Sequence, residues 1–231
     1  MMRKFYCLII LLLSSFYLYA DHFTYPVISQ QAPTLQKFIP GDWKILDVDM
    51  GDLNKDGYPD IAFVITNENQ CDTPEPENPD FKVCPRLLGI AFWDNEKQTF
   101  VLKEQTNNFI KSADSSTMDE PFEGITIRKG SLQIDFHYWY SMGTWYTNND
   151  RYIFRYQNDH FELIGFAEDT THRATLETTQ ISVNYSTKQI ILTTGEGETG
   201  KSESKTIPFN IDKLYTFANV NDQDISRYIS K

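Results

Sequence analysis

The sequence predicts an all-β protein built mainly of antiparallel hairpins, with short helices near its two ends. Apolar and polar residues alternate along many short segments, as in strands with one buried face. Polar turns separate these segments at short intervals, which is typical of a sandwich or a partial propeller-like arrangement. The chain also contains 13 Tyr and 16 Phe among its 231 residues, and aromatic side chains favour strands.

The first twenty residues have the layout of a secretory signal peptide. Arg3 and Lys4 precede an uncharged, largely apolar run over 5–20. We predict cleavage after Ala20 and a periplasmic or secreted mature chain, 21–231, that folds as a single β-rich domain. The alternative is an uncleaved anchor helix. No second apolar run is long enough to cross a membrane.

The mature chain is strongly acidic. Removal of the signal peptide takes away two basic residues and no acidic one, which changes the formal net charge from −11 to −13. Such a surface repels nucleic acid and anionic lipid, so we expect neither as a partner. It is compatible with cation binding.

The first strands follow an irregular lead-in. Residues 28–39 predict a short helix or an irregular segment, and the pattern changes to period two from Trp43 onward. The run IAFVIT (61–66) is continuous, apolar and β-branched, which predicts a buried strand. RLLGIAFW (86–93) predicts a second one, with TFVLKEQ (99–105) pairing back against it.

Three further hairpins are predicted where alternating segments flank short polar turns. Their ranges are 123–139, 150–168 and 178–194. Residues 205–211 predict an edge strand, because Pro208 cannot donate to a ladder. The tail 221–230 predicts a short capped helix. The polar stretch 106–120 is the place where a domain boundary could fall.

Two cysteines remain after signal cleavage, Cys71 and Cys84. An even pair in an exported chain predicts a disulfide. Three prolines lie between them, so the loop cannot be regular helix or central strand. The bridge would stabilise the fold by roughly 3 kcal/mol in the chain-entropy view. A cysteine-based metal site is the alternative, but no third or fourth Cys or His lies nearby in the sequence.

Residues 51–60 read GDLNKDGYPD and predict a calcium loop. Side-chain oxygens recur at alternate positions around a glycine that permits a sharp turn, and calcium prefers such hard oxygen ligands. The predicted ligands are Asp52, Asn54, Asp56, the carbonyl of Tyr58, and Asp60.

Other ions and other loops fit less well. An EF-hand needs Glu at position 12, where this chain has Phe63, so Asp60 must close the site instead. Magnesium demands stricter octahedral geometry, and zinc is disfavoured by the absence of His and Cys from the loop. The alternative is a polar turn that binds no metal.

The loop and the strand that follows it resemble the calcium loops of FG-GAP and VCBS-type β repeats. In those repeats a D-x-[DN]-x-D-G-x-x-D loop links two strands, and the resemblance implies a structural metal. The longer run 38–65, together with 121–134 and 151–166, resembles a group of uncharacterised exported bacterial proteins. That group implies no activity. The single loop copy argues against a full propeller.

Residues 195–202, GEGETGKS, match the phosphate-loop pattern G-x-x-x-x-G-K-[ST]. A phosphate loop needs a helix that starts at its Lys, so that backbone N–H groups face the phosphates. Here SESKTIPFN follows, with Pro208 within it. We therefore predict a polar hairpin tip and no nucleotide.

The segment HYWYSMGTWY (137–146) concentrates aromatic residues around Ser-Met-Gly-Thr. We expect these rings chiefly to fill the core, because large aromatics dominate core packing. If exposed, they would form the best candidate surface for a glycan or protein partner outside the metal loop. The residues are Tyr138, Trp139, Tyr140, Trp145 and Tyr146.

Together these features predict an exported, calcium-stabilised β-rich protein that serves as a binding or scaffold module. A hydrolase is the alternative, and a pocket combining His137 with an acidic residue and a nucleophile would favour it. A purely structural envelope component is the third class. The sequence assigns no catalytic residue.

Overall fold

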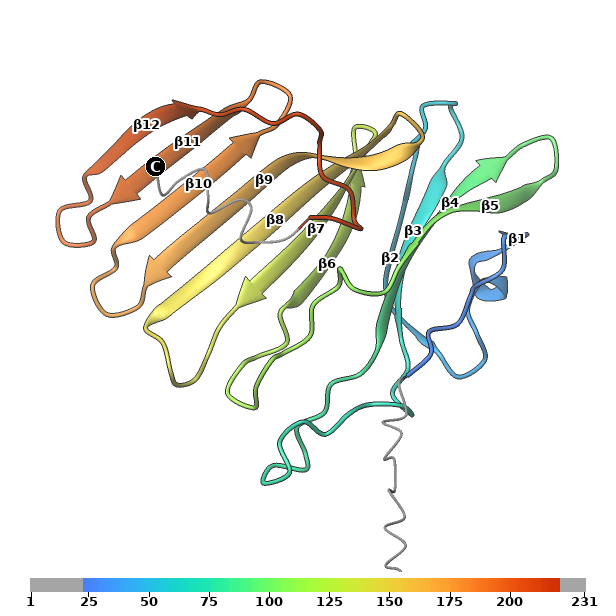
Figure 1. Cartoon of the computed structure of the whole chain (residues 1–231), viewed down its shortest axis with the longest axis horizontal. Coiled ribbons are helices and arrows are strands. Elements are labelled where there is room, and N and C mark those ends of the chain that lie inside the picture. Colours follow the sequence, from blue (N-terminus) through green and yellow to red (C-terminus); the bar gives the residue numbers. More distant parts are fainter. Residues whose placement is uncertain (1–22, 221–231) are drawn as a thin grey trace, which may run out of the picture.

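The computed structural model describes residues 23–220, which form two antiparallel sheets (Figure 1). The first sheet has the strand order β1-β5-β4-β3-β2 and the second has the order β12-β11-β10-β9-β8-β7-β6. The first comprises β1 (Gln31–Ala32), β2 (Lys44–Gly51), β3 (Asp60–Thr66), β4 (Arg86–Asp94) and β5 (Thr99–Thr106). The second comprises β6 (Phe122–Arg128), β7 (Ser131–Tyr138), β8 (Tyr146–Gln157), β9 (His160–His172), β10 (Thr178–Asn184), β11 (Gln189–Gly195) and β12 (Ser202–Pro208).

The predicted all-β class is confirmed, with two antiparallel sheets in a sandwich-like arrangement. All strands of the second sheet pair with their neighbours in the chain, as the predicted hairpins require. Pro208 ends β12, the edge strand. The N-terminal helix is reduced to one 3-10 turn, η1 (Leu35–Lys37), and the predicted helix over 221–230 lies outside the described residues. No helix within 23–220 is long and apolar enough to span a membrane.

Strand β3 is buried on both faces, and every one of its residues is at most 4% exposed. Ile61, Phe63 and Ile65 pack into a cluster with the N-terminal segment, which supplies Phe38 and Trp43. The residues between them belong to the core shared with the second sheet. This double burial explains why IAFVIT is continuously apolar.

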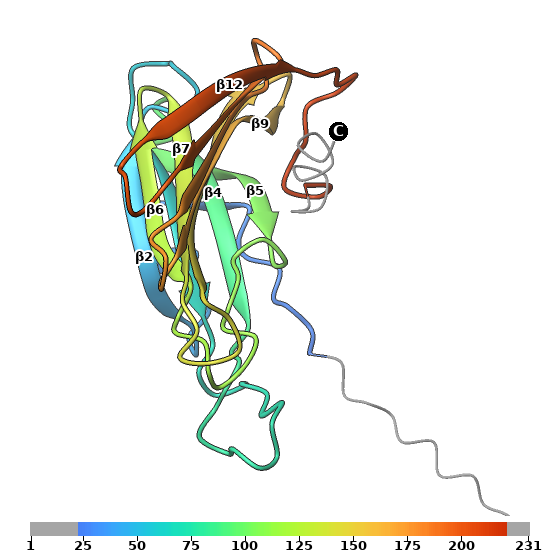
Figure 2. The same cartoon turned by 90° about the vertical axis from the view of Figure 1, so that its left-hand side faces the viewer.

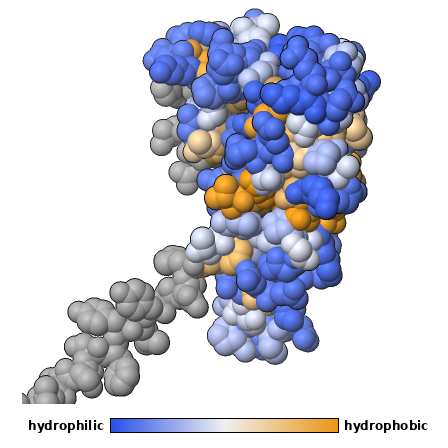
Figure 3. Space-filling view, turned by 90° about the vertical axis from the view of Figure 1, so that its right-hand side faces the viewer, coloured by the Kyte–Doolittle hydropathy of each residue, from blue (hydrophilic) through white to orange (hydrophobic). Residues whose placement is uncertain are grey.

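The N-terminal segment forms the outer cover of the first sheet. Figure 3 views the molecule from that side and shows apolar side chains gathered in the middle of a largely hydrophilic face. Beneath it, Phe63 lies opposite Gly89 of β4, and a Cβ on Gly89 would overlap the Phe63 ring. The glycine is therefore needed for this ring to lie flat across the sheet.

The segment 106–120 is part of the core between the sheets rather than an exposed linker. Phe109 makes edge-to-face contacts with Phe136, Tyr152, Phe154 and Phe217, with ring centroids 5.1–6.2 Å apart. One buried cluster contains this residue and members of both sheets. Buried contacts thus cross the stretch where the sequence permits a boundary.

The predicted Cys71–Cys84 disulfide is present. It closes a loop between β3 and β4 in which Asp72 and Val83 pair through two backbone hydrogen bonds of 2.8 and 3.0 Å. The side chain of Glu75 reaches out of this loop and accepts the N–H of Ser116 at 3.0 Å. The loop is thereby tied to the segment that precedes β6.

The two sheets meet along one line, where β2 runs beside β6 (Figures 1 and 2). Carboxylates, not a backbone ladder, join the two strands. Asp47 Oδ2 accepts the N–H of Ile125 at 2.7 Å, and Asp49 Oδ2 accepts the N–H of Ile127 at 2.6 Å. The second oxygen of each carboxylate accepts the N–H of the next residue in β2 at 2.8 Å. We call this line the seam.

Glycines permit the close approach at the seam. A Cβ on Gly51 would lie 2.6 Å from the Ile127 side chain. On the other strand, Gly124 has φ 141°, a region that favours glycine, and a Cβ there would lie 2.8 Å from Asp47 Oδ2. Side chains at either position would push the strands apart.

We predict that Asp49→Ala destabilises the protein by about 1.5–3 kcal/mol, because the Ile127 and Met50 amides each lose a charged acceptor. Chemical unfolding in urea measures this change. Glu198→Ala removes a carboxylate from an exposed hairpin tip and serves as the control. Equal stability of the two variants would contradict the role given to Asp49.

Candidate functional site

The predicted metal loop, residues 51–60, connects β2 to β3. Lys55 (φ 66°) and Gly57 (φ 91°) adopt left-handed conformations that let the chain turn sharply. Asp52 stabilises the turn, since its two oxygens accept the N–H groups of Asp56 at 3.1 Å and Gly57 at 3.0 Å. Asp56 in turn accepts the N–H of Tyr58 at 2.9 Å.

Three of the predicted ligands converge in this loop. The Asp56 N–H lies between an oxygen of Asp52 and the Oδ1 of Asn54, at 3.1 and 3.0 Å. The Asn54 amide also donates to Asp56 Oδ2 at 2.8 Å. The atoms that could bind a metal here are carboxylate and amide oxygens, which suit a hard cation such as calcium.

Asp60, the fourth predicted side-chain ligand, turns inward. It is fully buried and accepts three backbone N–H groups, from Leu53 at 2.8 Å, Asn54 at 3.2 Å and Trp93 at 3.0 Å. A carboxylate has about four lone pairs. Oδ2 accepts two of these hydrogen bonds and Oδ1 accepts the third, so one lone pair on Oδ1 remains. Asp60 therefore anchors the loop to β4 first, and only its Oδ1 has capacity for an ion.

Within residues 23–220, no three His, Cys, Asp or Glu side chains gather closely enough to form a metal site by themselves. An ion at the loop would therefore depend on Asn54 and on backbone oxygen as well as on carboxylates. The predicted ligand set includes the Tyr58 carbonyl and stays a prediction.

Burial raises the pKa of Asp60 to about 6, although its three backbone hydrogen bonds act in the opposite direction. The negative charge of Asp56 raises this pKa further. The loop thus holds carboxylates that repel one another, and a bound cation would relieve that repulsion.

The loop packs against the turn between β6 and β7. A Cβ on Gly130 in that turn would lie 3.1 Å from the Lys55 side chain and 3.5 Å from the carbonyl of Asp52. The loop therefore sits at one end of the seam, and its conformation bears directly on how the two sheets meet.

We predict a pH-dependent difference between the wild type and Asp60→Asn in EDTA. Because the folded pKa of about 6 exceeds the unfolded 3.8, the stability contributed by the protonated carboxyl is complete below pH ~4 and is lost as pH rises through 6. The wild-type advantage, meaning its free energy of unfolding minus that of Asp60→Asn, should therefore shrink by up to about 3 kcal/mol between pH 4 and 7. Urea unfolding at several pH values measures it, and an advantage that grows with pH would contradict the assignment.

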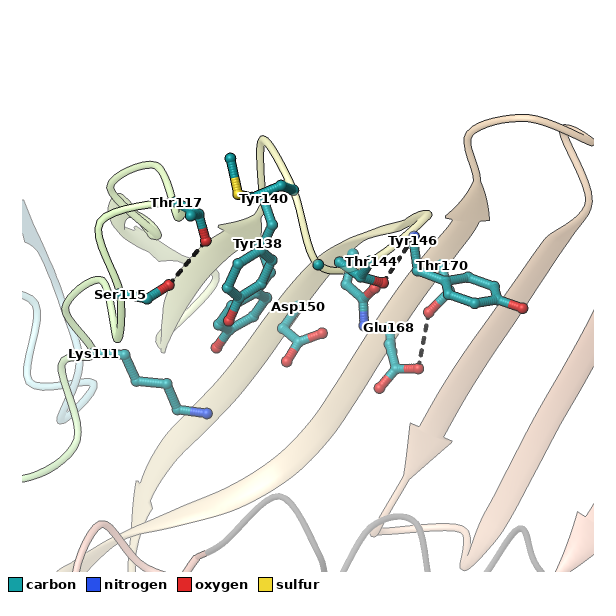
Figure 4. A pocket seen from close by; sticks show the side chains of 13 residues that line it. Lys111, Ser115, Thr117, Tyr138, Tyr140, Thr144, Tyr146, Asp150, Glu168 and Thr170 are labelled. Atoms are coloured by element: carbon teal, nitrogen blue, oxygen red, sulfur yellow. Dashed lines mark hydrogen bonds between the residues drawn. The ribbon is translucent and has the colours of Figure 1, made fainter.

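A groove of about 790 Å³ lies at the opposite end of β7 from the metal loop (Figure 4). Its floor is formed by the ends of β7, β8 and β9, and one wall by the segment that precedes β6. Three aromatic residues line it, namely Tyr138, Tyr140 and Tyr146. The hydroxyl and amide side chains that line it include Ser115, Thr117, Thr144, Asn148 and Thr170.

Two carboxylates project from the groove floor. Asp150 of β8 and Glu168 of β9 are direct partners in the antiparallel register, and Figure 4 shows them on the same side of the sheet. Thr170 donates to Glu168 at 3.1 Å. Asp150 is buried, whereas Glu168 is half-buried.

The wall opposite the carboxylates carries one basic residue, Lys111, and the half-buried phenol of Tyr140. The Lys111 ammonium lies 5.5 Å from the centre of the Tyr138 ring, within range of a cation–π interaction. Tyr140 donates to Asp114 at 2.8 Å. Burial and the Asp114 carboxylate raise the pKa of Tyr140 to about 12, so the phenol stays neutral.

The five aromatic residues of segment 137–146 divide between the groove and its surroundings. Tyr138 and Tyr140 line the groove in half-buried positions, and Tyr146 lines it at 52% exposure. Trp145 is 64% exposed beside them, while Trp139 packs against Arg173 at 5.2 Å. The prediction that these rings chiefly fill the core is wrong for Trp145 and Tyr146, because Trp145 lies in the loop before β8 and Tyr146 stands at the exposed first position of that strand.

Sequence reasoning missed the carboxylates of the groove. A signal was present, because Asp150 precedes Tyr152 and Phe154 at period two and therefore occupies a core-facing position of its strand. Glu168 stands in the same relation to Phe166 in β9. Charged residues on an otherwise apolar strand face indicate either a partner or a ligand.

Histidines do not contribute to the described groove lining. His137 Nε2 lies 3.0 Å from the Thr147 hydroxyl, and His172 Nδ1 accepts the N–H of Thr175 at 3.1 Å. The GEGETGKS segment forms the tip between β11 and β12, where the Glu196 N–H donates to the Lys201 carbonyl at 2.9 Å. A strand follows the tip where a phosphate loop requires a helix.

Comparisons with known proteins do not assign the fold or the groove to a known group. No protein family, curated protein or solved structure matches the chain.

Proposed function

We propose that the protein is an exported, calcium-stabilised binding protein whose groove takes a carbohydrate ligand. The observation that carries the proposal is the groove itself, in which tyrosine rings, hydroxyls and two carboxylates converge on a concave surface. Concave sites with aromatic walls and a few convergent polar groups are typical of ligand sites.

The chemistry of the lining suits a sugar. A pyranose ring presents C–H groups that pack on aromatic rings, and three tyrosines line the groove, with Tyr146 the most exposed of them. Its hydroxyl groups donate to acceptors, which Asp150 and Glu168 supply. Thr144 and Asn148 add groups that both donate and accept, so hydroxyls around a sugar ring can be paired from several directions.

A peptide ligand fits the groove less well. Extended peptides commonly bind by adding a strand to a free sheet edge. The floor strands β7, β8 and β9 are each paired on both sides, so they offer no free edge. Recognition here would depend on side chains alone, which is how sugars are bound.

Export is supported by the disulfide. Bridges of this kind persist in the periplasm and outside the cell, and are rare in a reducing cytoplasm. The predicted signal peptide, residues 1–20, lies outside the described residues and remains a prediction.

Calcium would act on the fold, at a distance from the ligand. Asp52, Asn54 and Asp56 would hold it, with the Tyr58 carbonyl and the remaining Oδ1 capacity of Asp60. The loop contacts the β6–β7 turn, whereas the groove lies at the far end of β7, about 25 Å away at the rise of a strand. The ion would neutralise the loop carboxylates and fix the loop against the turn.

A hydrolase is the second candidate, favoured by one observation. Asp150 and Glu168 are cross-strand partners, so their Cβ atoms lie roughly 5 Å apart. Most glycosidases use a pair of carboxyl groups, separated by about 5–5.5 Å when they retain configuration. Release of new reducing ends from bound oligosaccharide would distinguish cleavage from binding alone.

We predict that calcium raises the melting temperature of the mature protein, 21–231, above its value in EDTA. The expected rise is several degrees, because binding to the folded state adds to its stability. Asp56→Ala should remove the response, since this side chain faces both Asn54 and the turn amides.

Magnesium serves as the control in the same melting experiment and should give a smaller shift. An unchanged melting temperature in calcium, together with wild-type behaviour of Asp56→Ala, would reduce the loop to a turn without a metal.

We predict that Tyr146→Ala weakens oligosaccharide binding by tenfold or more, because it removes an exposed ring from the groove. Isothermal titration calorimetry with chito-, cello- and peptidoglycan-derived oligosaccharides measures it. Ile191→Ala, which removes a comparably exposed side chain from β11, is the matched control. The absence of binding to every sugar class by the wild type would reject the carbohydrate assignment.

A further inference from the structure

A second hollow adjoins the groove. It has a volume of about 730 Å³, and Lys111, Tyr138 and Tyr140 line both it and the groove. The two hollows therefore adjoin at these three side chains. Its far side is formed by Asp72, Pro74 and Val83, which belong to the disulfide loop.

We propose that the two hollows form one extended binding site for an oligosaccharide of several linked units, and that the Cys71–Cys84 loop forms its second subsite. This inference rests on the proposed carbohydrate function and specifies the ligand's length. Each hollow alone has the size of a small-molecule pocket, so together they fit a longer chain.

The second hollow offers the same kind of chemistry as the first. Asp72 contributes a carboxylate that accepts hydrogen bonds, and Asn107 and Asn108 contribute amides that both donate and accept. Tyr138 and Tyr140 stand between the hollows, where their rings can pack on the sugar unit that bridges them. An oligosaccharide running through the site would meet aromatic rings at its centre and polar groups at both ends.

The disulfide loop is coupled to both parts of the site. Its residues form the far wall, and the Glu75 carboxylate accepts the N–H of Ser116 at 3.0 Å. Ser115, the preceding residue, lines the first groove. Hydrogen bonds from Ser116 also lower the pKa of Glu75, so the contact persists at neutral pH.

The disulfide keeps this wall in place. It closes the loop one residue outside the paired Asp72 and Val83, and the loop contains three prolines with little secondary structure of its own. Once the bridge is open, the wall depends on individual hydrogen bonds such as the Asp72–Val83 pair and the Glu75–Ser116 contact, each of which contributes little, so the wall can move away from the groove. We therefore expect a reduced protein to retain the first subsite and lose the second.

Calorimetry with oligosaccharides of one linkage type, from disaccharide to hexasaccharide, tests the inference. For the wild type we expect affinity to rise by tenfold or more from the shortest to the longest. Asp72→Ala should lose most of that gain and keep its affinity for the disaccharide. Glu77→Ala, an exposed acidic residue of the same loop outside the hollow's lining, is the matched control and should behave like the wild type.

The Cys71→Ser/Cys84→Ser variant tests the role of the bridge, and its melting curve shows whether it folds. If it does not fold, Asp72→Ala and the length series still decide the question. Equal affinity of the wild type for all lengths, or a full length gain in Asp72→Ala, would overturn the extended site and leave carbohydrate binding intact. Failure of every length to bind would reject the proposed function together with this inference, and tight binding of an extended peptide instead would do the same.

Discussion

The hydrogen bonds from the β6 backbone to the carboxylates of Asp47 and Asp49 are the interactions on which the arrangement of the two sheets depends. A backbone ladder at this line would continue one sheet into the other. Carboxylates reach further than backbone carbonyls, so they satisfy the edge amides of β6 while the two sheets remain separate. Charged acceptors also make stronger hydrogen bonds than neutral ones. The core residues on the inner faces of both sheets can then pack against one another in one cluster.

The positions of the metal loop and of the groove follow from the seam. The loop 51–60 lies where β2 turns back into β3, and it contacts the β6–β7 turn at the end of the seam. The anchoring of Asp60 to the Trp93 amide ties the same loop to β4. At the other end of β7, the strands diverge from the segment that contains Lys111, and the groove opens between them. A cation at the loop would thus support the groove through the sheets without contacting its ligand.

Much of the fold could be predicted from local pattern. The runs at 61–66 and 86–93 identify the buried strands, because a strand covered on both faces needs no alternation. The predicted export and the two cysteines that remain after the predicted signal cleavage predict the bridge. The seam could not be predicted, since alternating Asp47 and Asp49 are equally typical of an exposed strand face. Only the tertiary structure shows which backbone they meet.

The sites were predictable in part. The 51–60 motif locates the oxygens that converge, but it cannot show that Asp60 turns inward, because the amide that holds it comes from Trp93, 33 residues later. The groove combines Lys111, segment 138–150 and the end of β9 around Glu168 and Thr170. Local periodicity carries no information on such long-range convergence, although the aromatic segment marked its centre.

Amide hydrogen exchange at Ile125 and Ile127, measured by NMR in calcium and in EDTA, tests the central claim most directly. If the carboxylates form the seam and the loop secures it, both amides are strongly protected, and protection falls in EDTA at the two sites more than in the middle of the second sheet. Exchange as fast as at the outer edge of β12 in both conditions would show that Asp47 and Asp49 do not hold the sheets together.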